Sequence, residues 1–360
     1  MSNTNKRIFL SPPFVGAAER AAVRAAFDSG YVAPCGPQVD EFERRLAKLA
    51  GRKYAVAVSS GTAAIDLLMA ELGVDETWTV VAPTLTFVAT VGPAFHRGAK
   101  LVFVDSDATG NIDISLLEKA LESLRGKILV IGVDLYGNCC DYGAIAKLCR
   151  KFGAVFVTDA AEAVGATRDG RPAGSAGLAG IYSFNGNKIV TTSGGGAIVT
   201  DDRGLAERAK KRSQQSREKC AWYEHREVGY NYRLSNILAA LGLAQLGRLP
   251  AILRKREANF KWYAKNWKGD LLAPTPGANH WLTVALLASR RERDRLLRRF
   301  AAADIEARPV WKPLHLQPIF AKCRVFGGEV AKALFERGVC LPSGTGLKSC
   351  DFARIARCLK

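Results

Sequence analysis

The chain has 360 residues, of which 48% are hydrophobic and 24% are charged. These values exclude extended disorder and allow one large domain with a smaller one. The formal net charge is +18, but the basic residues are spread over helical stretches such as 206–217 and 290–299, without an aromatic-interleaved stripe. We therefore expect a solvated basic surface that could attract a phosphorylated substrate, and neither a nucleic-acid nor a membrane partner.

Two further features bear on the cellular compartment. Residues 1–14 contain no apolar signal-peptide region, and no run reaches the roughly 18 to 20 apolar residues of a membrane span. Only Cys139 and Cys140 lie close together among the nine cysteines, so neither a CxxC motif nor zinc-ligand spacing is present. We expect reduced packing thiols, no metal site and a cytoplasmic location.

The first expected element is a helix over residues 16–29, and a segment with two prolines, 30–37, breaks it. We expect this region to form an arm that leads into the core. From about residue 54 to 200, short β-branched runs alternate with helical stretches, which is typical of a parallel sheet covered by helices. The expected strands are 54–58, 79–82, 101–104, 128–133, 154–158, 180–184 and 197–200.

After about residue 250 the pattern changes. Basic helical stretches flank an apolar run at 281–287, and a short helical segment ends the chain. The shift predicts an arm and a large α/β domain over residues 1–248, and a small α+β domain over 249–360. The expected fold class is α/β, with a mostly parallel sheet in the large domain.

Two residues that follow predicted strands suggest a cofactor. Asp159 comes directly after the run 154–158, at the carboxyl edge where open α/β sheets bind ligands. Lys188 follows the next strand and precedes three glycines, 194–196, which allow close backbone approach. Taken alone, each has a simpler explanation, a helix cap for Asp159 and a surface lysine for Lys188. Together they match pyridoxal 5′-phosphate (PLP), which bonds to a lysine amine and needs a carboxylate beside its pyridine nitrogen.

The phosphate of PLP requires an anion site, and a strand-to-helix turn at residues 58–63 offers one. Gly61 admits a phosphate, and the amides of Gly61 and Thr62 lie where the helix dipole begins. Ser183 could add a hydroxyl, although an ordinary helix cap explains the turn equally well. Phe87 could stack on the pyridine ring, although a lone aromatic is more often core packing.

Six sequence blocks support a family resemblance that extends from about residue 8 to the C-terminus. On these blocks the chain resembles the DegT/StrS family of PLP-dependent nucleotide-sugar aminotransferases, which have the aspartate-aminotransferase fold (fold type I). The blocks are SSGTAA (59–64), PTLTFVAT (83–90), DAAEAVGA (159–166), SFNGNK (183–188), GYNYRLSN (229–236) and RPVWKPLHLQPIF (308–320).

The resemblance implies roles for individual residues. Lys188 corresponds to the lysine that bonds to PLP, Asp159 to the partner of the pyridine nitrogen, and Phe87 to the stacking ring. Glu162 takes the position that faces the phenolic oxygen of the ring, where many members have glutamine or histidine. Asn231 matches an asparagine that reaches the phosphate from the neighbouring subunit, so the resemblance implies a homodimer with shared active sites.

The resemblance also indicates a substrate class. Glu162, the arm at 30–37 and the block around His315 are most similar to those of enzymes that aminate a UDP-linked 4-keto-6-deoxy-N-acetylhexosamine, with L-glutamate as amino donor. Tyr31, His315 and Gln317 are the implied substrate contacts, although a structural role is at least as common for a lone histidine. GDP-perosamine synthases, which use a GDP-linked 4-keto-6-deoxymannose, share Glu162 and are the alternative.

The lysine itself favours amination. One branch of the family has histidine in place of this lysine and dehydrates sugars, whereas this chain has Lys188. We therefore predict a ping-pong transamination in the synthesis of surface polysaccharides. Two other hypotheses are a PLP-binding regulator without turnover, which glutamate would not convert, and a nucleic-acid binder, which would leave Asp159 and Lys188 unexplained.

Overall fold

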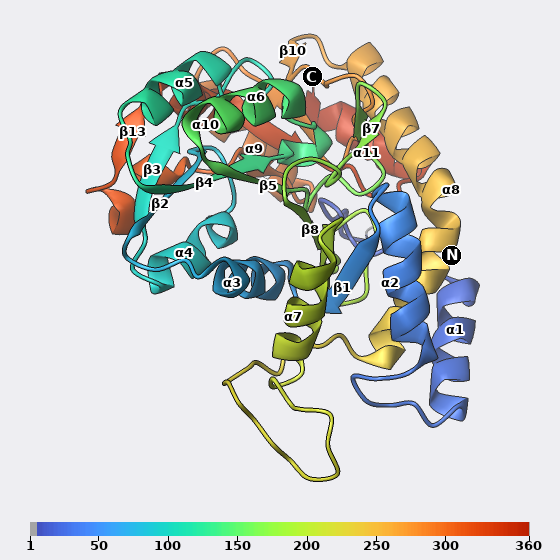
Figure 1. Ribbon diagram of the computed structural model, residues 1–360. Helices are drawn as coiled ribbons and strands as arrows, with labels where there is room; N and C mark the ends of the chain where they lie inside the picture. Colours follow the sequence, from blue (N-terminus) through green and yellow to red (C-terminus); the bar gives the residue numbers. More distant parts are fainter. Residues whose placement is uncertain (1–5, 360) are drawn as a thin grey trace.

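The computed structural model describes residues 6–359 (Figure 1), so the outermost residues of the two predicted domains, 1–5 and 360, lie outside the described part. Its main element is an eight-stranded sheet of order β1-β9-β8-β5-β4-β2-β3-β13. Neighbouring strands are parallel, except that β9 is antiparallel to β1 and β8. The strands are β1 (Tyr54–Val58), β2 (Trp78–Pro83), β3 (Lys100–Val104), β4 (Lys127–Val133), β5 (Val155–Asp159), β8 (Ala179–Ser183), β9 (Gly196–Thr200) and β13 (Arg324–Phe326). The predicted α/β class with a mostly parallel sheet is confirmed.

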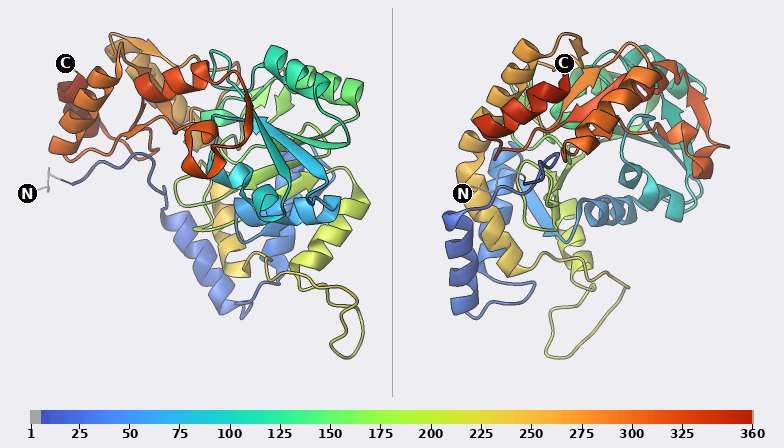
Figure 2. Two further views of the ribbon diagram at one scale, coloured as in Figure 1. Left: turned by 90° about the vertical axis from the view of Figure 1, so that its left-hand side faces the viewer. Right: turned by 180° about the vertical axis from the view of Figure 1, so that it is seen from behind.

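Helices cover both faces of this sheet (Figures 1 and 2). Side chains alternate between the two cores along each strand: Val81 packs in one core, and Val80 and Ala82 pack in the other. Strands buried on both faces have continuous apolar sequences, which explains why these runs were recognisable. One core contains residues of α2 (Pro37–Leu49), α5 (Ile114–Glu122), α6 (Tyr142–Phe152) and α8 (Asn236–Asn266), and the other contains residues of α3 (Gly61–Leu72), α4 (Gly92–His96) and α7 (Arg203–Ser213).

A second, antiparallel sheet of order β10-β11-β14-β12 forms from the C-terminal part of the chain. Its strands are β10 (Asp270–Leu271), β11 (Thr283–Leu286), β12 (Arg308–Pro309) and β14 (Gly338–Leu341). The helices α9 (Arg290–Ala302), α10 (Glu329–Arg337) and α11 (Ser349–Leu359) accompany it. The predicted boundary at 248/249 falls inside α8, and β13 joins the large sheet, so the division at this point stays a prediction.

The remaining elements are short or peripheral. Helix α1 (Ala17–Asp28) packs along α8, in agreement with the expected helix before the arm. The others are the hairpin of β6 (Thr167–Arg168) and β7 (Arg171–Pro172), and 3₁₀ turns at Val88–Thr90, Leu135–Gly137, Leu314–Leu316 and Pro318–Phe320. The segment between α7 and α8 projects from the body as a long loop (Figure 1).

Helix α8 is long and apolar enough to cross a membrane by length and composition, the one such helix between residues 6 and 359. Its position in the core of the protein explains this apolar composition. The helix lies against α1 and α2 and buries four polar side chains, all of which are hydrogen-bonded to the protein: Asn236, Gln245, Arg256 and Asn259. Buried and satisfied polar groups of this kind are typical of a core helix in a globular fold.

Candidate active site

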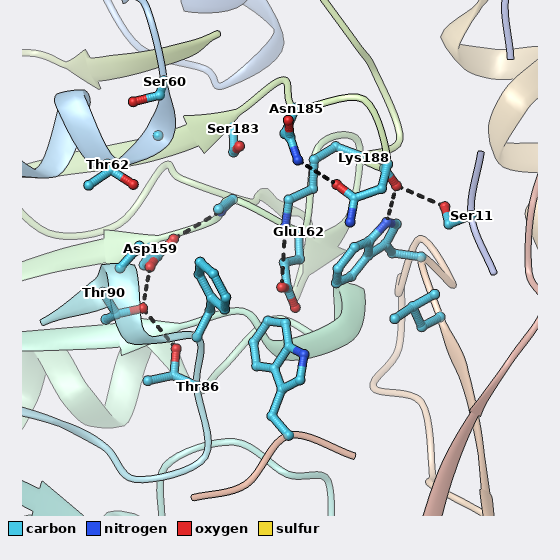
Figure 3. A pocket seen from close by; sticks show the side chains of 18 of the residues that line it. Ser11, Ser60, Thr62, Thr86, Thr90, Asp159, Glu162, Ser183, Asn185 and Lys188 are labelled. Atoms are coloured by element: carbon cyan, nitrogen blue, oxygen red, sulfur yellow. Dashed lines mark hydrogen bonds and ion pairs between the residues drawn. The ribbon is translucent and has the colours of Figure 1, made fainter. Parts of the chain in front are cut away.

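A cavity of about 780 Å³ lies at the carboxyl ends of β4, β5 and β8, and residues near β11 and β12 form its opposite side. Figure 3 shows the side chains that converge on it. Seven of the predicted site residues line it: Gly61, Thr62, Phe87, Asp159, Glu162, Ser183 and Lys188. Residues that are remote in sequence are thus brought together at the sheet edge where the fold predicts a ligand.

The Lys188 amine lies between a carboxylate and an aromatic ring. Its Nζ is 3.3 Å from Glu162 Oε1 and 4.1 Å from the centre of the Trp281 ring. The side chain is only 13% exposed, so Glu162 and the face of Trp281, rather than bulk water, surround the amine. The amine is fixed at the cavity wall, where a bound aldehyde can reach it.

Glu162 is buried beside this amine. Its Oε2 accepts a hydrogen bond from the Tyr136 amide at 2.7 Å, while Oε1 faces Lys188. Burial raises the pKa of Glu162 to about 7, although the charge of Lys188 and the bond from Tyr136 act in the opposite direction. A carboxyl group with this pKa can hold or release a proton near neutral pH.

Asp159 ends β5 with both oxygens engaged. Oδ2 accepts from Thr90 Oγ1 at 2.7 Å, and Oδ1 accepts from the Ala161 amide at 3.1 Å. Thr90 Oγ1 also pairs with Thr86 Oγ1 at 2.8 Å. Burial raises the pKa of Asp159, against the effect of these hydrogen bonds and of Lys188. A buried carboxylate without a close cation is costly, so a positively charged ligand atom at this position would offset the cost.

The turn between β1 and α3 combines a helix cap with an open anion site. Ser60 Oγ accepts from the Ala63 amide at 2.9 Å, so the simpler explanation, a helix cap, is correct for Ser60. The amides of Gly61 and Thr62 face no acceptor within residues 6–359 and belong to the first turn of α3. The Ser183 side chain lies beside Gly61, with its Oγ 3.3 Å from where a Gly61 Cβ would be. A phosphate fits this turn.

Two tryptophans complete the cavity wall, and sequence reasoning did not identify them. The ring centres of Trp311 and Phe87 are 5.5 Å apart, and the face of the Trp281 ring lies against Lys188 Nζ. Phe87 is 56% exposed in the single chain, so it is a wall residue rather than core packing. Trp311 stands in the block RPVWKPLHLQPIF, and Trp281 begins the apolar run 281–287, but neither position carries a pattern specific to a ligand.

Four predicted site residues do not line the cavity. His315 Nδ1 pairs with Thr84 Oγ1 at 2.7 Å, which is a structural contact, and burial lowers its pKa. The Gln317 side chain donates to the Lys312 carbonyl oxygen at 3.3 Å. Tyr31 and Asn231 are exposed, in the arm and in the projecting loop. Their predicted roles remain predictions.

These groups fit PLP as a set. Within residues 6–359, Lys188 offers a partly buried amine, Asp159 a buried carboxylate without an ion pair, and the start of α3 two amides without an acceptor. Phe87 supplies an aromatic face in the same cavity. Each group alone has a structural explanation, but the four together match the aldehyde, the pyridine nitrogen, the phosphate and the ring of one molecule.

Comparison with known proteins gives matches along nearly the whole chain. The model of the DegT/DnrJ/EryC1/StrS aminotransferase family matches residues 13–360. EpsN of Bacillus subtilis, named as a pyridoxal phosphate-dependent aminotransferase, is 42% identical, with 99% of this chain and 95% of EpsN covered. A GDP-perosamine synthase of Caulobacter vibrioides is 35% identical, with 98% and 97% covered.

Two further matches cover a UDP-sugar enzyme and a solved structure. The UDP-4-amino-4,6-dideoxy-N-acetyl-beta-L-altrosamine transaminase of Campylobacter jejuni is 37% identical over 65% of this chain and 62% of its own length. The PLP form of the sugar aminotransferase Spr1654 from Streptococcus pneumoniae superimposes with a TM-score of 0.88 at 27% identity, with 99% of this chain and 100% of Spr1654 covered.

Proposed function

The chain belongs to the DegT/DnrJ/EryC1/StrS aminotransferase family and is a PLP-dependent sugar aminotransferase, and from this premise we propose its substrates. The amino acceptor is UDP-2-acetamido-4-keto-2,6-dideoxyhexose, and the amino donor is L-glutamate. The product serves the synthesis of amino sugars for surface glycans, in the cytoplasm.

The placement of Lys188 supports amination rather than sugar dehydration. Its Nζ lies in the cavity within 3.3 Å of Glu162, a carboxyl group that can exchange a proton with it. PLP supplies, when bound, an electrophilic carbon and a ring that accepts electrons. Lys188 carries the cofactor, and its amine moves a proton at the reacting carbon atoms of donor and acceptor.

The other residues bind and orient. The amides of Gly61 and Thr62, with the Ser183 hydroxyl, hold the phosphate. Asp159 would keep the pyridine nitrogen protonated, and its two hydrogen bonds from Thr90 and Ala161 fix the orientation of the carboxylate. Phe87 would cover one face of the ring, and Glu162 would lie on the side of its phenolic oxygen.

We further propose a homodimer whose subunits complete each other's sites. Asn231 does not line the cavity of its own chain and forms a β-bridge with Gln214, which follows α7. Both belong to the segment between α7 and α8 that projects as a long loop (Figure 1). This loop exposes Trp222, Tyr223 and Val228, and large exposed apolar side chains favour a contact with another protein. In the dimer, Asn231 reaches the phosphate in the partner's site, while Tyr31 and His315 contact the sugar nucleotide.

Mass spectrometry tests the substrate. The protein, loaded with PLP, is incubated with L-glutamate and either a UDP-linked 4-keto-6-deoxy-N-acetylhexosamine or GDP-4-keto-6-deoxymannose. We expect the aminated UDP sugar to form at least about tenfold faster than the aminated GDP sugar, a difference of about 1.4 kcal/mol in transition-state binding. The Lys188→Ala variant is the control and should give neither product, nor the visible absorbance of lysine-bound PLP.

The alternative acceptor is GDP-4-keto-6-deoxymannose. It is supported by the 35% identity to a GDP-perosamine synthase along nearly the full length of both chains, whereas the UDP-sugar transaminase matches over only 65% of this chain. A faster reaction with the GDP sugar would establish this alternative. Failure with both sugars would overturn the substrate assignment and leave the cofactor assignment intact.

A further inference from the structure

Arg256 is a buried cation without an acidic partner. It lies in the middle of α8 with 1% of its surface exposed, and no carboxylate pairs with it in the described part of the chain. Burial lowers its pKa to about 9. An unpaired buried charge is destabilising unless dense hydrogen bonding offsets the loss of hydration, so the contacts that hold this guanidinium indicate what it does.

All the acceptors of Arg256 are neutral and come from segments that meet beside the cavity. Its Nε donates to Thr345 Oγ1 at 3.0 Å, and Nη1 donates to the carbonyl oxygens of Ser343 at 2.8 Å and Trp281 at 2.9 Å. Its Nη2 donates to Ser11 Oγ at 3.0 Å. The planar guanidinium therefore connects α8 with the N-terminal segment, the residues just before β11 and the loop after β14.

Two of these partners, Ser11 and Trp281, also hydrogen-bond to the peptide group between Asn187 and Lys188. Ser11 Oγ donates to the carbonyl oxygen of Asn187 at 2.8 Å, and Trp281 Nε1 donates to the same oxygen at 2.7 Å (Figure 3). The Lys188 amide donates to the Asn185 carbonyl oxygen at 2.9 Å. The peptide plane between residues 187 and 188 is thus fixed from both sides, and the Trp281 ring also lies 4.1 Å from Lys188 Nζ.

We propose that Arg256 is a positioning residue for the cofactor-bearing lysine, acting through Ser11 and Trp281 on the carbonyl oxygen of Asn187. The network holds the Lys188 backbone and the face of Trp281 in one arrangement, so that the Lys188 amine does not have to find its reactive position in each half-reaction. This inference rests on the proposed role of Lys188.

Two conservative variants test the network without removing the buried charge. Ser11→Ala deletes one donor to the Asn187 oxygen, and Trp281→Phe deletes the other while it keeps an aromatic ring near Lys188. We expect each to lower kcat about tenfold with KM for L-glutamate changed by less than about twofold, because each removes one hydrogen bond that orients a reacting group. Because both donors act on one oxygen, the double variant should deviate from the product of the single effects.

A second measurement does not depend on turnover or on the cofactor. In PLP-free protein, the pH dependence of acetylation at Lys188, followed by mass spectrometry, reports how the amine is held. We expect its midpoint to shift in Ser11→Ala, Trp281→Phe and Arg256→Met. The pH at which lysine-bound PLP changes its visible absorbance should shift in the same variants. Arg254→Met, an exposed position on the same helix, is the matched control and should shift neither.

The outcomes separate the possibilities. If Ser11→Ala and Trp281→Phe keep wild-type kcat and both midpoints, the positioning role is overturned, even if Arg256→Met fails to fold. A purely structural role of Arg256 predicts lower stability with unchanged midpoints in all soluble variants. If wild-type protein does not attach PLP at Lys188, the proposed function fails, whereas a shifted acetylation midpoint would still support the network.

Discussion

The raised pKa of Glu162 makes the stability of the folded protein depend on pH. Burial raises the pKa of its carboxyl group from 4.5 to about 7, so the folded cofactor-free protein binds this proton more tightly than the unfolded chain. The resulting stabilisation is complete below pH 4.5, decreases as pH rises and is lost above about pH 7. Glu162→Gln has no titrating group at this position and escapes the loss.

We therefore expect Glu162→Gln to gain stability relative to the wild type between pH 4.5 and pH 7.5. The gain should be on the order of 3 kcal/mol, since each pKa unit corresponds to about 1.36 kcal/mol. Urea unfolding of the PLP-free proteins at both pH values measures it. A difference in unfolding free energy that does not change with pH would show that Glu162 titrates normally.

The sequence predicted the candidate cofactor residues, but not the residues that hydrogen-bond to them or position them. Asp159 and Lys188 were predictable because PLP chemistry needs these two residue types, and each follows a recognisable strand. Thr90, which donates to Asp159, and Arg256, which acts at a distance from Lys188, were not. A hydrogen bond between residues 69 positions apart, or a network that passes through Ser11, leaves no periodic pattern in the chain.

At the scale of elements, the phosphate turn depends on close packing between β9 and the start of α3. A Cβ on Gly196 would lie 2.4 Å from the carbonyl carbon of Ser60, and 2.5 Å from the Gly61 amide nitrogen. Both contacts are with backbone atoms, which a rotamer change cannot relieve. The glycines at 194–196 were expected to allow close backbone approach, and at Gly196 the neighbour is the backbone of Ser60 and Gly61.

Gly196→Ala should therefore displace the α3 N-terminus and weaken PLP binding about tenfold or more, because the Gly61 and Thr62 amides no longer converge on the phosphate. Titration of the PLP-free protein with PLP measures the Kd. Gly143→Ala, in α6, is the control, because the nearest atom to its new Cβ would be Asp141 Oδ1 at 3.6 Å, an ordinary van der Waals distance. Equal affinities for the two variants would refute this account of the turn.

Strand positions were predictable where both faces are buried. All seven strands expected from apolar runs occur within one residue of their predicted bounds. The direction of β9 was not predicted, since a short apolar run looks the same in parallel and antiparallel pairing. Strand β13 was missed because three residues, two of them exposed, carry no alternation. It pairs with β3 only because the chain after α9 returns to the large sheet.

At the scale of the whole molecule, segments from each side of the predicted boundary at residue 248 belong structurally to the other side. Ile8 pairs with Ile305 beside the small sheet, α8 runs unbroken past the boundary, and β13 completes the large sheet. The cavity draws residues from both parts. The sequence pattern shows a change near residue 250, but it does not show that these segments pack across the boundary.

The proposed dimer predicts complementation between two inactive variants. Lys188→Ala lacks the cofactor-bearing lysine, and Asn231→Ala lacks the side chain that is proposed to reach the partner's phosphate. If sites are shared, a heterodimer of the two has one site with both defects and one site with both wild-type residues. In an equal mixture that allows subunit exchange, about half of the dimers are heterodimers, each with one intact site. The mixture should therefore regain about one quarter of the activity of the same amount of wild-type protein.

The same mixture distinguishes shared from separate sites. If Lys188 and Asn231 of one chain served one site, every site in the mixture would keep a defect and no activity would return. Lys188→Ala mixed with Glu162→Gln is the matched control, because both residues line the cavity of their own chain; its activity should not exceed the sum of its parts. Light scattering of each variant must show dimers, because activity restored by a monomer would contradict the shared site.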